Sequence, residues 1–164
     1  GMIEVTMGTP LHEIIYSIGG GIPQGKKLKA VQTGGPSGGV LPSNIENLSV
    51  DYDVLKNAGS MLGSGGMVIM DEDTDMVKIA RYFTEFFAQE SCGKCVPCRE
   101  GVSRMCKLLE EIINEYGSKH YLEALQDMAA SIMSASACAL GKTAPVPVLT
   151  TIKHFQNDYL KYLS

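Results

Sequence analysis

The spacing of four cysteines constrains this chain more than any other feature of its sequence. Cys92, Cys95 and Cys98 form the pattern C-x₂-C-x₂-C, and Cys138 follows 40 residues after the third of them. Three thiolates spaced in this way on a tight loop can bind three irons of a cubane, and the fourth iron needs a ligand from elsewhere. The small residues of 134–141 let a loop around Cys138 approach closely. The pattern therefore predicts one [4Fe–4S] cluster held by these four cysteines.

The residues between the cysteines suit a negatively charged cluster. Backbone N–H groups of this tight loop, which includes Gly93, are expected to turn toward the sulfurs. No acidic residue lies between Ser91 and Arg99, whereas Lys94 and Arg99 carry positive charge that offsets the thiolates. Gly93, Lys94 and Arg99 are therefore predicted to surround the cluster without ligating it, and Lys142 is a further cation that could offset its charge.

Other uses of the cysteines fit the sequence less well. Structural zinc also takes four cysteines, but usually from two C-x₂₋₄-C knuckles. Disulfide exchange at a C-x-x-C pair leaves the third cysteine of the loop and Cys138 unexplained. Cys106 falls on the apolar stripe of a predicted helix, which is typical of a small core residue. None of the three histidines has a second ligand at useful spacing.

Composition and charge exclude several functions. The chain has 164 residues, 45% of them hydrophobic, which is enough for a buried core. A formal charge of −4 without a basic run argues against nucleic acid as a partner. No apolar stretch approaches the roughly 20 residues that cross a bilayer, and the N-terminus lacks the basic-then-apolar order of a signal peptide. We therefore expect a cytoplasmic protein without direct membrane insertion, and read Gly1 as the remnant of a tag.

The first 72 residues predict a small α+β domain rich in glycine turns. A helix is expected after residue 8, with Thr9 as its N-cap and Pro10 at its first position. Its neighbours are predicted as strands Met2–Met7, Leu28–Thr33 and Met67–Met70 and a short helix near Asp51–Ala58. The glycines at 19–21 and 34–39 match neither G-x-G-x-x-G before a helix nor a P-loop. They are interpreted as turns, so no nucleotide site is predicted here.

Residues 73–164 predict a four-helix bundle that carries the cysteine loop between its first two helices. The acidic run Asp71–Asp75 suits a helix start, because negative side chains favour the positive end of the helix dipole. Beyond it the apolar period becomes 3.6. The expected stripes are Ile79, Tyr82, Phe83, Phe86 and Phe87; Val102, Met105, Cys106, Leu109, Ile112, Ile113 and Tyr116; Tyr121, Leu122, Leu125, Met128, Ala129 and Ile132; and Ile152, Phe155, Tyr159 and Tyr162.

These residues resemble a known family. The segment 90–101, Glu-Ser-Cys-Gly-Lys-Cys-Val-Pro-Cys-Arg-Glu-Gly, is similar to the cluster loop of the NADH-binding flavoprotein subunit of respiratory complex I. The β subunits of NAD(P)-linked iron hydrogenases and NAD-dependent formate dehydrogenases share this loop. Residues 138–145 resemble the family's fourth-ligand segment, and 57–66 its glycine-rich link. Residues 2–50 resemble its β-grasp domain, which is of the soluble-ligand-binding type.

The resemblance implies a role in electron transfer. It implies that NAD(P)H and FMN bind in an N-terminal domain that this chain lacks, and that the cluster passes electrons onward. The implied partners are a [2Fe–2S] thioredoxin-like subunit and a larger iron–sulfur or hydrogenase subunit. The 164 residues would then be part of an oxidoreductase and no enzyme by themselves. The alternative is a module that binds a small ligand or docks a subunit, with a structural cluster or zinc.

Overall fold

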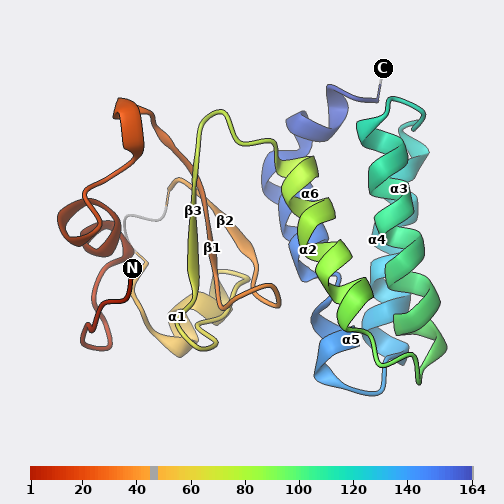
Figure 1. The fold of residues 1–164 in the computed structure, drawn as a ribbon, viewed down its shortest axis with the longest axis horizontal. Coiled ribbons are helices and arrows are strands. Elements are labelled where there is room, and N and C mark those ends of the chain that lie inside the picture. Colours follow the sequence, from red (N-terminus) through yellow and green to blue (C-terminus); the bar gives the residue numbers. More distant parts are fainter. Residues whose placement is uncertain (45–47, 164) are drawn as a thin grey trace. The chain divides into compact units, whose positions relative to one another are not determined.

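The computed structural model describes residues 1–44 and 48–163. Within them the chain divides into two compact units, Gly1–Thr74 and Asp75–Ser164, each with its own hydrophobic core. The first contains the β-sheet and the second is helical (Figure 1). The predicted α+β class is confirmed.

A three-stranded antiparallel sheet organises the first unit, with strand order β2-β1-β3 (Figure 1). The strands are β1, Leu28–Thr33; β2, Val40–Pro42; and β3, Met67–Asp71. Two of them confirm the predicted strands, and β2 was not predicted because its short apolar run lies among turn residues. The central strand β1 buries its second half, since neighbours pair with both of its edges.

Short helical segments complete the first unit. Helix α1, Tyr52–Asn57, confirms the helix predicted near this position, and the Asp51 carboxylate caps it by accepting the N–H groups of Asp53 and Val54 at 2.9 and 3.0 Å. The segment η1, Glu13–Ile18, is a short π-helix, and η2, Pro23–Gly25, is a single 3₁₀ turn. The core of this unit consists of Leu11, Ile15, Val31, Leu41, Leu55 and Leu62.

The predicted strand Met2–Met7 is wrong. Met2 is 98% exposed, and no described strand pairs with this segment. Antiparallel contacts begin only afterwards, where the N–H of Gly8 donates to the carbonyl of Val50 at 2.9 Å. An apolar run forms a strand only where a neighbour takes up its backbone groups. Thr9 is not an N-cap either, because its hydroxyl donates to the carbonyl of Thr6.

The second unit is a bundle of four long helices, as predicted (Figure 1). They are α2, Met76–Glu90; α3, Ser103–Ile113; α4, His120–Ala135; and α6, Val146–Leu160. Two short helices were not predicted. They are the π-helix η3 at Pro97–Val102 and the α-helix α5 at Ala139–Thr143. The largest fully buried side chains of the bundle include Phe87, Met105, Leu109, Ile112, Leu125, Ile132 and Tyr159.

The predicted stripe of α2 is partly wrong. Tyr82 and Phe86 are 65% and 41% exposed, whereas Ala80 and Thr84 are fully buried. Small residues face the neighbouring helices because close packing leaves no room for an aromatic ring there. Burial of the Thr84 hydroxyl is tolerated because it donates to the carbonyl of Ala80 at 2.8 Å.

The start of α2 is fastened to the end of α6. Asp75 caps α2 by accepting the N–H groups of Val77 and Lys78 at 2.9 and 3.2 Å, and the Tyr162 hydroxyl donates to its second oxygen. The N–H of Met76 donates to the carboxylate of Asp158 at 3.3 Å. These contacts fix one end of the bundle without help from any cofactor.

Asp75→Ala is expected to destabilise the bundle, because it removes the α2 cap and the acceptor of the Tyr162 hydroxyl at once. Losing such a cap costs about 0.5–2 kcal/mol in the free energy of unfolding. Urea unfolding followed by far-ultraviolet circular dichroism measures this. Asp127→Ala on the exposed face of α4 is the control and should stay within about 0.5 kcal/mol of wild type. Equal effects of the two variants would contradict a capping role for Asp75.

Candidate metal centre

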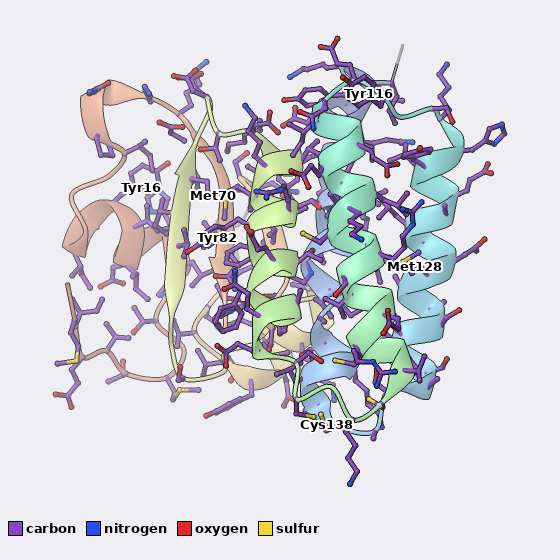
Figure 2. The ribbon with its side chains drawn as sticks, turned by 45° about the vertical axis from the view of Figure 1, so that its right-hand side comes forward. Tyr16, Met70, Tyr82, Tyr116, Met128 and Cys138 are labelled. Atoms are coloured by element: carbon purple, nitrogen blue, oxygen red, sulfur yellow. The ribbon has the colours of Figure 1, made fainter. Side chains whose placement is uncertain are left out.

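The cysteine loop and the Cys138 segment lie at the same end of the bundle. The loop leaves α2 after Glu90 and enters η3, which packs against α4 and α5. Cys138 is the residue immediately before α5 and closely follows the end of α4. In Figure 2 its label lies at the end of the bundle where the loop from α2 turns back. The fold therefore brings together segments that are far apart in the sequence.

The electrostatic surroundings of Cys95 include the segment that precedes Cys138. The pKa of the Cys95 thiol lies below its ordinary value, mainly because the backbone N–H of Ala137 donates to it. The N–H of Cys98 and that of Cys95 itself act in the same direction, against partial burial, which raises the pKa. Because Ala137 immediately precedes Cys138, the sulfur of Cys95 lies beside the segment predicted to supply the fourth ligand.

Cys98 is the most enclosed of the four cysteines, with 4% of its surface exposed. Its sulfur lies 3.3 Å from the hydroxyl oxygen of Ser91, which itself accepts the N–H of Gly93 at 3.3 Å. Either the Ser91 hydroxyl or the Cys98 thiol can be the donor in this contact. Cys92 and Cys138 are exposed, and Cys95 is half-buried.

Glycine is required at position 141 by the packing around Cys98. A Cβ added to Gly141 would lie 2.5 Å from the hydroxyl oxygen of Ser136 and 3.1 Å from the Cβ of Cys98. The first separation is shorter than any real Cβ contact, and the second is already crowded. The absence of a side chain at 141 is what lets α5 approach the cysteine loop.

Arg99 holds the loop closed from outside. Its Nη1 donates to the carbonyl of Gly93 at 2.6 Å, and its Nε donates to Glu100 at 2.8 Å. Gly93 has φ of +76°, a left-handed conformation that glycine adopts without strain. Lys94 is exposed. Of the residues predicted to surround the cluster, Arg99 and Gly93 thus form the turn itself.

The residues at this end fit an iron–sulfur cluster, although they do not form a closed site. Among residues 1–44 and 48–163, no three His, Cys, Asp or Glu side chains lie close enough to hold a metal ion, and all five cysteines are free thiols. The donors are all sulfur, and the buried Ser136 hydroxyl has no hydrogen-bond partner. Metal binding commonly draws such ligands together. Ligation by Cys92, Cys95, Cys98 and Cys138 remains a prediction.

Cys106 lies elsewhere, on α3, but it is not the core residue that was predicted. It is half-buried, and burial raises the pKa of its thiol. The charged groups that act on it are Arg81 and Glu85 of α2 and Glu110 of α3. Its side chain therefore lies at the edge of the α2–α3 contact.

Ser91, Ser136 and Gly141 belong to this site and were missed as individual residues. The sequence showed only that 134–141 is a run of small residues. A hydroxyl without a partner becomes visible only once its surroundings are known. Because Ser91 directly precedes Cys92, the sequence alone shows that it lies near the loop. Its contact with the Cys98 sulfur is visible only in the structure.

The fold and the cysteine loop together define an iron–sulfur-binding helical bundle joined to a small α+β unit. Residues 78–162 match the family described as the NADH-ubiquinone oxidoreductase-F iron–sulfur binding region. The chain belongs to this family, and the resemblance seen in the sequence is confirmed.

Proteins similar to this chain in sequence are named as subunits of larger enzymes. The NADP-reducing hydrogenase subunit HndC of Solidesulfovibrio fructosivorans is 46% identical over 97% of this chain and 32% of its own length. An F-type subunit of the NADH-quinone oxidoreductase of Rhizobium meliloti is 40% identical over 99% of this chain and 39% of its length. The chain thus spans about a third of these relatives.

A solved structure shows the same fold. An NAD⁺-reducing [NiFe]-hydrogenase in the H₂-reduced state superposes with a TM-score of 0.83 and 31% identity, over 96% of this chain and 26% of that one. In the described part of the present chain, no helix is long and apolar enough to cross a membrane.

Gly141→Ala is expected to destabilise the bundle even without metal, because the new methyl group would overlap Ser136 and crowd Cys98. Overpacking of this kind costs about 1–3 kcal/mol. The free energy of unfolding of the metal-free chain, measured in urea, tests this. Ala139→Ser at the exposed start of α5 is the control. Wild-type stability of Gly141→Ala would mean that α5 does not pack closely on the cysteine loop.

Proposed function

We propose that this chain is the electron-transfer module of an NAD(P)H-oxidising flavoprotein subunit, with one [4Fe–4S] cluster held by Cys92, Cys95, Cys98 and Cys138. The observation that carries the proposal is the close approach of α5, the helix that directly follows Cys138, to the C-x₂-C-x₂-C loop, where a Cβ added to Gly141 would lie 3.1 Å from the Cβ of Cys98. The iron–sulfur family to which residues 78–162 belong supports the same cofactor.

The chain's own residues have separable tasks in this proposal. The four thiolates bind iron, and a bound cluster accepts and releases one electron at a time. Arg99 keeps the loop in its turn by holding the carbonyl of Gly93. The Ser91 hydroxyl lies 3.3 Å from the Cys98 sulfur and would donate to it once that sulfur is a thiolate. Enclosure of Cys98 keeps water from that side of the site.

The two-electron chemistry belongs to other parts of the assembly. We propose that NAD(P)H and FMN bind in an N-terminal domain outside these 164 residues, and that the whole enzyme works in or facing the cytoplasm. Electrons would leave toward a [2Fe–2S] thioredoxin-like subunit or a larger iron–sulfur or hydrogenase subunit. Relatives named as hydrogenase and quinone oxidoreductase subunits support membership in a multisubunit enzyme.

A second candidate is that the first unit docks a partner or a small ligand while the metal is only a structural crosslink. The observation in its favour is the number of large apolar side chains that this unit exposes. They are Met2, Ile3, Met7, Tyr16, Ile18, Tyr52, Val68 and Ile69. Docking of this kind is compatible with electron transfer, but zinc in place of the cluster is not.

Anaerobic reconstitution with iron and sulfide tests the ligand set. The wild-type chain should bind about four irons and absorb near 400 nm, as expected for one [4Fe–4S] cluster. Cys138→Ser should lose most of this iron because one corner of the cubane then lacks its thiolate. Cys106→Ser is the matched control and should bind iron as wild type does.

Two outcomes would contradict the proposal. One equivalent of zinc and no iron after this procedure would identify a structural zinc site. Full iron content in Cys138→Ser, with an unchanged electron paramagnetic resonance spectrum, would remove Cys138 from the ligand set. To separate relay from crosslink, Cys138→Ser in the assembled enzyme should lose electron transfer from NAD(P)H to the acceptor subunit, whereas loss of a purely structural cluster would lower stability alone.

A further inference from the structure

Ser136 is a buried hydroxyl beside the proposed cluster that the ligand set does not use. The residue is 4% exposed, and its Oγ has no hydrogen-bond partner. The backbone N–H of Ser136 donates to the carbonyl of Ile132 at 3.0 Å and closes the last turn of α4. The backbone N–H therefore has a partner, whereas the side-chain hydroxyl does not. A buried hydroxyl in this state costs free energy.

The Ser136 hydroxyl lies near Cys98. A Cβ built on Gly141 would be in contact with both the Ser136 Oγ and the Cys98 Cβ, so these two groups lie around the same point of α5. Ser136 therefore lies beside one of the proposed ligands and two residues before another, Cys138.

Alanine would avoid the cost of an unpaired hydroxyl at this position. Ser91 offers a contrast on the other side of Cys98, because its hydroxyl accepts from Gly93 and lies 3.3 Å from the Cys98 sulfur. The two serines differ in that one already has its partners and the other has none.

We propose that Ser136 is a positioning residue that donates its hydroxyl proton to a cluster sulfur on the Cys98 side and raises the reduction potential. Reduction adds negative charge to the sulfurs, so a hydrogen-bond donor stabilises the reduced state more than the oxidised state. Loss of the donor should therefore move the midpoint potential to a more negative value. This inference rests on the proposed [4Fe–4S] function of the same site.

The test compares reconstituted wild-type chain with Ser136→Ala. Iron content should be equal, and the midpoint potential, from a redox titration followed by electron paramagnetic resonance, should be more negative in the variant. Ser136→Thr, which retains the donor, should restore the wild-type potential. Ser134→Ala is the matched control, because the exposed Ser134 hydroxyl donates to the carbonyl of Ser131 at 3.1 Å and should leave the potential unchanged.

A second measurement serves if Ser136→Ala binds no cluster, and it uses Ser91→Ala to remove the other hydroxyl that lies near Cys98. In D₂O, electron–nuclear double resonance of the reduced cluster in Ser91→Ala should reveal exchangeable protons near its sulfurs, one of them with the coupling of a hydroxyl. Absence of a hydroxyl-type coupling overturns the inference, as does an unchanged potential in an iron-loaded Ser136→Ala. Either result leaves the proposed function standing. A wild-type chain that binds no iron overturns the proposed function and this inference with it.

Discussion

Helix α5 packs on the cysteine loop where Gly141 meets Cys98, and this close approach joins two segments that lie far apart in the sequence. Much of the second unit serves to make it possible. Helices α3 and α4 carry the chain away from the cysteine loop and back again, and α5 turns over the end of the bundle. Gly141 leaves room for that turn, because a side chain there would overlap Ser136 and crowd Cys98.

The two ends of α2 are stabilised by different chemistry. At its start, Asp75, Asp158 and Tyr162 join α2 to α6 through hydrogen bonds that need nothing beyond the polypeptide. At its end, about 22 Å away for 15 residues, exposed thiols and an unpaired hydroxyl lie where iron is proposed to bind. Hydrogen bonds between side chains and backbone therefore hold one end of the bundle together, and the proposed cluster would crosslink the other end.

The sequence predicted what depends on local pattern and missed what depends on neighbours. Periodicity located the four long helices, and cysteine spacing identified the loop whose family the comparisons confirm. The run Met2–Met7 has strand composition, yet no described strand lies beside it. The aromatic residues Tyr82 and Phe86 point outward because Ala80 and Thr84 allow closer helix packing. In the sequence, Ser136 is one small residue among several, and only the structure shows that its hydroxyl is buried without a hydrogen-bond partner.

The bond from Arg99 to the carbonyl of Gly93 bears on how such a protein survives damage. Iron–sulfur centres are vulnerable to oxygen, and a loop shaped only by its metal would collapse each time the metal was lost. Here an arginine on the following turn maintains the loop's conformation independently of iron. Loss of the proposed cluster would leave this turn in place, and iron would return to a partly formed site rather than to an unfolded segment.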